Sequence, residues 1–394
     1  MITAVICWMI YTSQSHATTG AAGELLKHLA DIASLLFFLL GAMAIVELID
    51  LNNGFYIISQ YITSTDKRKL LIIIVSLSFF LSALLDNLTT AIVMTSICSK
   101  VLADKEDRLW FAGMIVIAAN AGGAWSPLGD VTTTMLWIGG QITPLALIKQ
   151  LILPAVIVCV VPLIIVSFRF SGKKVNTIPA SICSDIEEKD GKIILCCGAG
   201  FLVLVPVFKS ITHLPPFMGM LLALGLMWII TSFLHKNKES EYASRFTVAR
   251  ALEKVDTPSI LFFLGILLSV SALQSSGILK EVAAVLNDNL KNDFLIGTTL
   301  GLLSSVVDNV PLVAASQGMY DLSLYPPDHY FWPFLALTTG TGGSAIIIGS
   351  AAGVAVMGIE RINFIWYIKK ISWLALVGFL SGILVFLLQQ QLGW

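Results

Sequence analysis

Apolar residues follow one another along this chain in long blocks that short polar or glycine-rich breaks separate. Blocks of this kind are typical of helices that cross a membrane, which need roughly 20 apolar residues for a full span. The predicted spans and half-spans cover residues 32–49, 70–85, 88–99, 109–119, 131–138, 151–168, 193–208, 218–234, 259–275, 294–307, 310–320, 331–358 and 371–388. Two amphipathic stretches, 54–65 and 278–289, predict interfacial helices. The pattern indicates an all-α polytopic membrane protein.

The same polar interruption occurs twice inside these apolar blocks. Asp308-Asn309 follows Asp86-Asn87 by 222 positions, and the glycine-rich break at Gly342 follows the one at Gly122 by 220 positions. Landmarks that recur at nearly one offset predict an internal duplication. Interrupted apolar segments at corresponding positions of two halves also point to the binding site of a transporter.

Charge placement predicts how the first copy enters the membrane. The arms 70–85 and 88–99 are each short for a full span. Lysine and arginine precede the first arm, and a lysine follows the second. Since positive residues favour the cytoplasmic side, both ends are predicted to be cytoplasmic. The segment is therefore predicted to be a re-entrant hairpin with Asp86-Asn87 at its tip, and two tight full spans are the alternative.

The second copy carries the opposite charge signature. Its connection, residues 321–330, contains no lysine or arginine, which predicts entry from the other side of the membrane. The fold prediction is therefore two inverted-topology repeats, each with a re-entrant hairpin and a broken transmembrane helix. The breaks are expected at 120–130 and within 331–358. The predicted domains are 1–24, 25–168, 169–258 and 259–394, in order an N-terminal apolar segment, the first repeat, a connecting segment with two spans, and the second repeat.

The N-terminal segment has two interpretations. Residues 2–11 are apolar and Ser15-His16-Ala17 resembles a signal-peptidase site, so cleavage after Ala17 is one expectation. No lysine or arginine precedes the apolar part, and a short extra span or an interfacial segment is the other.

Composition narrows the functional class further. Hydrophobic residues make up 56% of the chain, charged residues 12%, and the mean hydropathy is +0.86. The net charge is −1 without a basic patch, which argues against nucleic acid as a partner. No HExxH, GxSxG or nucleotide-binding loop is present, so we predict neither an enzyme nor a cofactor nor ATP drive. An ion gradient is then the expected energy source.

Carboxylates inside apolar membrane segments are costly, and their presence predicts a function. Asp86 and Asp130 supply charge for a hard cation such as Na⁺ or Li⁺, which prefers oxygen ligands, and Asp308 is a further candidate for cation and proton binding. Backbone carbonyls of the broken helices can complete the coordination. Burial disfavours a charged carboxyl group, whereas a bound cation favours it, so one group can hold either H⁺ or Na⁺ in competition. The neutral side-chain oxygens nearby belong to Asn87, Thr89, Thr132, Thr133 and Asn309.

Several of these residues have a structural alternative. Asp86 and Asp308 could form hairpin-tip turns whose side chains cap the backbone, and Asp130 could cap the half-helix that follows it. The threonines could be helix-packing residues. Glu47, near the end of the first span, is either a proton relay or an interfacial residue facing lipid headgroups.

The motifs that surround these residues carry a family resemblance. The segments LLDNLTTAIVM, AANAGGAWSPLGDVTTTMLWIGG, VVDNVPLVAAS and GTGGSAIIIGSAAGVAVMG resemble the NhaD-type sodium/proton antiporters of the ion transporter superfamily, and the similarity runs from about Leu25 to the end. Ile347 departs from the pattern, because relatives often carry a second small polar residue there. The matching functional positions are Asp86, Thr89, Asp130, Thr132, Thr133, Ser304, Asn309 and Ser344.

The resemblance implies exchange of Na⁺ or Li⁺ for H⁺ in the lipid bilayer, by a homodimer with scaffold and transport domains that moves like an elevator. The expected location is the cell's inner, cytoplasmic membrane, as a multi-pass protein. The alternative is a superfamily relative that exports arsenite or carries a dicarboxylate. Carboxylates at the hairpin tip and the broken helix oppose an anionic substrate, while neutral arsenite is compatible with their charge.

Overall fold

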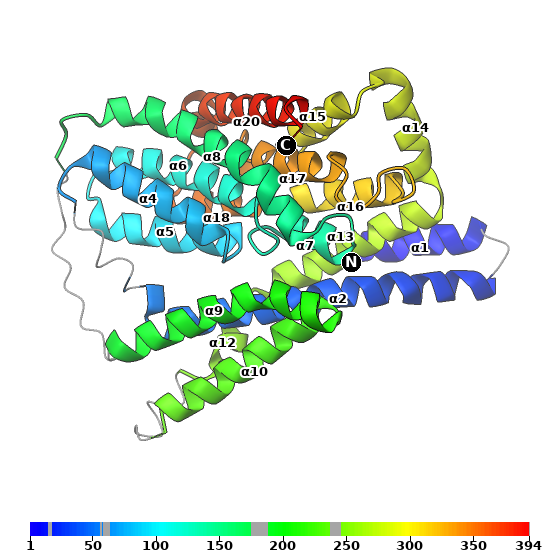
Figure 1. Cartoon of the computed structure of the whole chain (residues 1–394), viewed down its shortest axis with the longest axis horizontal. Coiled ribbons are helices and arrows are strands. Elements are labelled where there is room, and N and C mark those ends of the chain that lie inside the picture. Colours follow the sequence, from blue (N-terminus) through cyan, green and yellow to red (C-terminus); the bar gives the residue numbers. More distant parts are fainter. Residues whose placement is uncertain (15–17, 56, 58–63, 175–187, 237–245, 394) are drawn as a thin grey trace. The chain divides into compact units, whose positions relative to one another are not determined.

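A computed structural model describes residues 1–14, 18–55, 57, 64–174, 188–236 and 246–393 (Figure 1). Within these residues the protein is helical, and the extended pairing consists of an isolated bridge between Asp66 and Lys174. The prediction of an all-α polytopic membrane protein is confirmed. Six helices of the described residues are long and apolar enough to cross a membrane: Gly20–Leu51, Pro144–Arg169, Lys189–Thr212, Pro216–Leu234, Thr257–Ser275 and Phe364–Gln391.

The chain folds into two compact units, and each takes segments from both halves of the sequence. Unit 1 lies within 1–61 and 182–280, and unit 2 within 62–181 and 281–394. The predicted repeats are continuous stretches of sequence, whereas these units are groups of helices that pack together. The predicted repeat boundaries therefore stay predictions. Unit 1 contains α1 (Ile2–Gln14), α2 (Thr18–Leu51), α9 (Glu188–Thr212), α10 (Pro216–Leu234), α12 (Val248–Lys254) and α13 (Thr257–Ser275).

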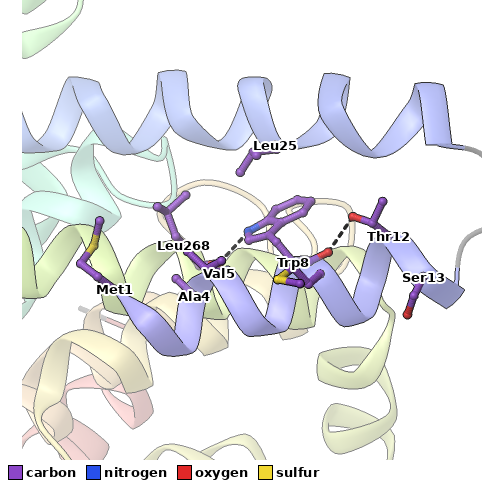
Figure 2. A pocket seen from close by; sticks show the side chains of 9 residues that line it. Met1, Ala4, Val5, Trp8, Thr12, Ser13, Leu25 and Leu268 are labelled. Atoms are coloured by element: carbon purple, nitrogen blue, oxygen red, sulfur yellow. Dashed lines mark hydrogen bonds between the residues drawn. The ribbon is translucent and has the colours of Figure 1, made fainter.

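In unit 1 the N-terminal segment forms helix α1, which packs against α13 (Figure 2). The Trp8 indole Nε1 donates a hydrogen bond of 2.9 Å to the carbonyl oxygen of Leu268. A largely apolar pocket of about 550 Å³ lies beside this contact, between α1, Leu25 of α2 and Leu268. The predicted cleavage site at Ala17 and most of the interfacial helix 54–65 lie outside the described residues.

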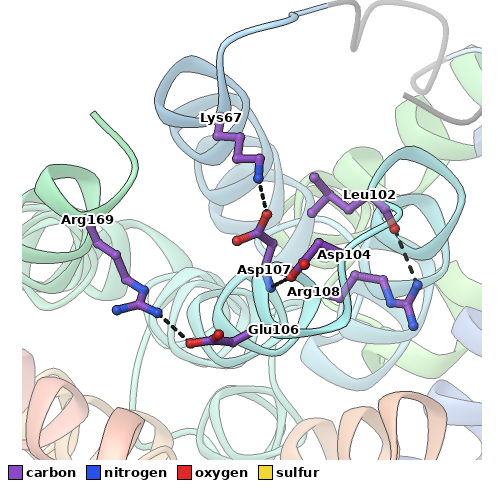
Figure 3. Close-up of polar contacts among 7 residues, drawn as sticks. All are labelled: Lys67, Leu102, Asp104, Glu106, Asp107, Arg108 and Arg169. Atoms are coloured by element: carbon purple, nitrogen blue, oxygen red, sulfur yellow. Dashed lines mark hydrogen bonds and ion pairs between the residues drawn. The ribbon is translucent and has the colours of Figure 1, made fainter. Parts of the chain in front are cut away.

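The first predicted hairpin lies in unit 2 as α4 (Lys67–Ser82) and α5 (Asn87–Val101). Helices of 16 and 15 residues are about 24 and 22 Å long, short of the roughly 30 Å hydrocarbon core, and this length favours a hairpin over two full spans. Both outer ends lie beside one charged cluster (Figure 3). There Lys67 pairs with Asp107, and Arg108 donates to the Leu102 carbonyl at 3.3 Å.

The second hairpin, α15 (Asp293–Leu303) and α16 (Asn309–Met319), begins and ends among aromatic residues instead. The hydroxyls of Tyr325 and Tyr330 each donate to the Asp293 carboxylate at 2.6 Å. The Tyr320 ring, just after α16, lies 5.4 Å from that of Tyr325. Each hairpin therefore has its two outer ends together, at a charged cluster in one case and an aromatic cluster in the other.

Two broken helices lie against these hairpins. The first is α6 (Lys105–Gly123) and α7 (Val131–Ile138), and the second is α17 (Phe331–Gly342), a 3₁₀ turn at Ile347–Gly349 and α18 (Ala351–Glu360). The first break starts at Ala124, later than the predicted Asn120, because Gly122 and Gly123 remain helical. Their role is close packing: a Cβ on Gly122 would clash with the Phe79 carbonyl, as one on Gly342 would with Gly301.

Helices α8 (Pro144–Arg169) and α20 (Trp373–Gln391) pack side by side and complete unit 2 (Figure 1). Glycines on α20 allow close approach, since a Cβ on Gly378 or Gly382 would clash with Val158. The short α14 (Ile278–Leu290) precedes the second hairpin, where the sequence predicts an amphipathic helix, and α19 (Phe364–Tyr367) with a π-helical turn precedes α20.

Gly122→Ala should destabilise unit 2 by about 1–3 kcal/mol, because the added methyl group overpacks the contact with the Phe79 backbone. The matched control is Gly358→Ala in α18, where an added Cβ meets nothing within 4 Å. Thermal melting of the two purified variants measures the difference. Equal melting temperatures would contradict the close-packing role of Gly122.

Candidate ion-binding site

Asp130 lies where the two hairpin tips meet inside unit 2. Its side chain is 1% exposed and caps α7, with Oδ1 accepting from the Thr132 backbone N–H at 3.0 Å. Asn87 of the first hairpin and Asn309 of the second each donate from Nδ2 to Asp130 Oδ2 at 3.0 Å. A buried carboxylate is stable only with such partners, so the two hairpin tips supply its compensation.

Asn120 connects this group to the second broken helix. Its Oδ1 accepts from Asn87 Nδ2 at 3.0 Å, and its own Nδ2 donates to Ser344 Oγ at 2.8 Å and Ser350 Oγ at 2.9 Å. All of these side chains are buried. We call the set Asn87, Asn120, Asp130, Asn309, Ser344 and Ser350 the buried cluster. It joins both hairpins and both broken helices.

Local sequence explains why four helices begin at the buried cluster. The first N–H groups of a helix lack partners within the helix, and aspartate or serine at the preceding position supplies them. Asp86 accepts from Thr89 N at 2.8 Å, and Asp308 accepts from Asn309 N at 2.9 Å. Ser350 accepts from the Gly353 N–H at 3.2 Å. Together with Asp130, these caps start α5, α16, α18 and α7.

The structure does not bond every predicted site residue to the buried cluster. Asp86 and Asp308 are half-buried, and their hydrogen bonds within the described residues stay in their own helix starts. Thr89 Oγ1 donates to Asp86 at 2.7 Å. This geometry is the capping arrangement that the sequence left as an alternative, and the ion-binding roles of these three residues stay predictions.

The predicted hydroxyl ligands differ in what they contact. Thr133 Oγ1 donates to the Ser126 carbonyl at 2.7 Å, and Ser304 Oγ donates to the Thr339 carbonyl at 2.8 Å, so both brace the backbone. Thr132 Oγ1 is buried and has no hydrogen-bond partner within the described part of the chain. Of these three hydroxyls, that of Thr132 is the one that does not donate to a backbone carbonyl. Ile347, the departure from the family motif, is buried in the 3₁₀ turn.

The sequence does not single out two members of the buried cluster, Asn120 and Ser350, as site residues. It places Asn120 in the glycine-rich break. Ser350 lies 220 positions after Asp130, the offset that relates Gly342 to Gly122, and this correspondence is the signal that could have identified it. Glu47, the predicted relay, lies in α2 of unit 1, so its role stays a prediction.

Comparison with known proteins shows which transporters this chain is similar to. Residues 1–340 match the family model described as "Citrate transporter". The chain is 46% identical over 395 residues to "Sodium/proton antiporter 1" of Arabidopsis thaliana, covering 100% of this chain and 68% of that protein. It is 44% identical to "Sodium/proton antiporter 2" of the same plant, covering 98% and 92%. It is 32% identical to "Na(+)/H(+) antiporter NhaD" of Vibrio cholerae, covering 98% and 85%.

The helical membrane fold, the buried polar cluster and these relatives define a multi-pass transporter rather than an enzyme. Within that class, the chain belongs to the NhaD-type sodium/proton antiporter family.

Proposed function

We propose that this protein exchanges Na⁺ for H⁺ across a membrane, and that the two ions compete for Asp130. The observation that carries the proposal is the buried Asp130 carboxylate, held between Asn87 and Asn309 from the two hairpin tips. The relatives named as sodium/proton antiporters support the choice of ions.

The amide contacts suggest how exchange proceeds at this carboxylate. The Nδ2 groups of Asn87 and Asn309 donate to Asp130. An arriving cation therefore has to displace these amide groups from the carboxylate oxygens of Asp130. Rotation of either amide would then present its Oδ1 to the cation, and Thr132 Oγ1 lies in the same helix start as a further oxygen. When the cation leaves, a proton neutralises the carboxyl group, because an uncompensated buried charge is costly.

The finer predictions from the sequence extend this proposal. Li⁺ is a hard cation like Na⁺ and would use the same oxygens. The half-buried carboxylates of Asp86 and Asp308 would attract cations toward Asp130, and Glu47 would relay protons. The family resemblance adds a homodimer and the cell's inner membrane.

One observation favours a second candidate, transport of an anion such as citrate. The free N–H groups at helix N-termini bind anions, and four helices begin at the buried cluster. The matching family model also carries a citrate transporter description. Against this candidate, three of the four helix starts are occupied by aspartates, which repel a carboxylate substrate.

Proteoliposomes with a trapped pH-sensitive dye test the function directly. A proton gradient is imposed, and Na⁺, Li⁺, K⁺, citrate and arsenite are added in turn. We expect Na⁺ and Li⁺ to dissipate the gradient and the other three to leave it unchanged. A response to citrate or arsenite without a response to Na⁺ would overturn the proposal.

A further inference from the structure

The repeat offset relates two corresponding groups of residues, which contain the buried cluster together with Ala124 and Gly340. The Asp130 side consists of Ala124, Asp130, Asn309 and Gly340, and Asn87 also donates to Asp130 Oδ2 from the other side. The Ser350 side consists of Ser344, Ser350, Asn87 and Asn120. Each residue of the first broken helix has its counterpart 220 positions later, and the two asparagines at the hairpin tips are 222 positions apart.

Hydrogen bonds outside the cluster obey the same correspondence. Ser82 Oγ donates to the Ala119 carbonyl at 2.6 Å, and Ser304 Oγ donates to the Thr339 carbonyl at 2.8 Å. Gly123 packs on the Gly129 carbonyl in one half, as Gly343 packs on Gly349 in the other. These contacts recur in both halves, and the corresponding side chains in the cluster differ in two respects.

The first difference is charge. Asp130 and Ser350 occupy corresponding positions, and each caps the helix that follows its break, α7 or α18. The Asp130 side therefore has a carboxylate where the Ser350 side has a neutral hydroxyl. A cation that loses its hydration gains far more from the carboxylate than from the hydroxyl.

The second difference is volume. On the Ser350 side, the Asn120 side chain extends to Ser344, Ser350 and Asn87 and bonds to all three. Its counterpart on the Asp130 side is Gly340, which has no side chain. A Cβ at Gly340 would lie 3.5 Å from the Ala124 Cβ and 3.7 Å from Asp130 Oδ2, which is ordinary contact. Gly340 thus leaves room for the volume of a methyl group beside Asp130 Oδ2.

We propose that Gly340 keeps Asp130 Oδ2 accessible to the cation, while Asn120 occupies the corresponding place on the Ser350 side, so that each chain binds one cation. The inference rests on the proposed function and adds its stoichiometry. The Asn120 amide donates to the two hydroxyls where a cation would otherwise contact them. The Asn120 amide satisfies the two hydroxyl oxygens and is itself neutral. A cation in its place would carry a charge that the Ser350 side, which has no carboxylate, could not balance.

The first test is calorimetric titration of Na⁺ into the purified full-length protein and its variants. Gly340→Ala should weaken Na⁺ binding about tenfold or more, a change of about 1.4 kcal/mol, because its methyl group covers Asp130 Oδ2. Gly340→Asn, which copies the Ser350 side, should remove detectable binding. Gly358→Ala, an exposed helical glycine of the same unit without neighbours within 4 Å, is the matched control. Wild-type affinity in a folded Gly340→Ala variant would overturn the inference.

The second test counts the bound ions by equilibrium dialysis with radioactive Na⁺. We expect one Na⁺ per wild-type chain, and two per chain in the double variant Asn120→Gly/Ser350→Asp, which gives the Ser350 side both the space and the charge of the other. Two Na⁺ per wild-type chain would overturn the inference while supporting the proposed function. No Na⁺ bound by the wild type would overturn the proposed function itself, so the two failures are distinguishable.

Discussion

Asp130→Asn should abolish Na⁺-dependent proton movement in proteoliposomes while the protein still inserts and purifies as a folded species. Asparagine has nearly the shape of aspartate and can cap α7 in its place, so the fold is retained. It cannot carry the negative charge, and a desolvated cation without that charge loses its main compensation, which costs several kcal/mol. Dye dequenching after Na⁺ addition measures the loss.

The matched control is Asp104→Asn, which changes the exposed cap of α6 and should leave exchange intact. Asp104 accepts from the Asp107 backbone N–H at 2.9 Å, and this bond holds the pKa of its carboxyl group below the usual value. Asp86→Asn separates the two interpretations of Asp86: a ligand role predicts the same loss as at Asp130, whereas a pure cap predicts retained exchange. Full exchange by Asp130→Asn would remove Asp130 from the mechanism.

Na⁺ affinity should weaken as the pH falls. A proton and a cation exclude one another at a shared carboxylate, so below the pKa of the cation-free group the apparent Kd should rise up to about tenfold per pH unit. The sign follows from the protonated state, which predominates at low pH and cannot hold Na⁺. Calorimetric Na⁺ titration at several pH values and constant ionic strength measures the slope.

Competition between H⁺ and Na⁺ also predicts that Na⁺ binding releases a proton. Na⁺ binding at a pH where the group is protonated should liberate about one proton per ion, which buffers of different ionisation enthalpy reveal in the same titrations. An affinity that is flat from acidic to neutral pH would show that H⁺ and Na⁺ use separate sites, and direct competition would then be wrong even with antiport intact.

Hydropathy was sufficient to predict most of the helices, because backbone N–H and C=O groups in lipid must find hydrogen bonds within the protein, which leaves few alternatives to helix. The half-helix at 131–138 has the predicted bounds, since Asp130 caps its start and Gly139 follows its last residue. Other bounds shifted. Helix α2 begins at Thr18 rather than Ile32, because polar residues are tolerated where a helix extends beyond its apolar part.

The candidate site was only partly predictable. Asp130 and the two tip asparagines stand out because their polarity interrupts apolar sequence. Asn120 and Ser350 do not, because their significance lies in a contact between residues 230 positions apart. In sequence, Ser350 is an ordinary helix cap. Its second partner, the Asn120 amide, follows only from the tertiary fold. Thr133 and Ser304, which the sequence predicts as ligands, donate to backbone carbonyls in the structure, and their ligand roles stay predictions.

The convergence of four helix starts has a consequence for the sign of the transported ion. Each helix dipole places about half a positive elementary charge at its N-terminus, so the backbone alone presents about two positive charges to the cluster. Such a frame suits an anion. The caps Asp86, Asp130 and Asp308 add three negative charges when ionised, and Ser350 adds none. The balance is about one negative charge, which a single monovalent cation or a single proton neutralises. Cation and anion carriers could therefore share this frame and differ chiefly in their helix caps.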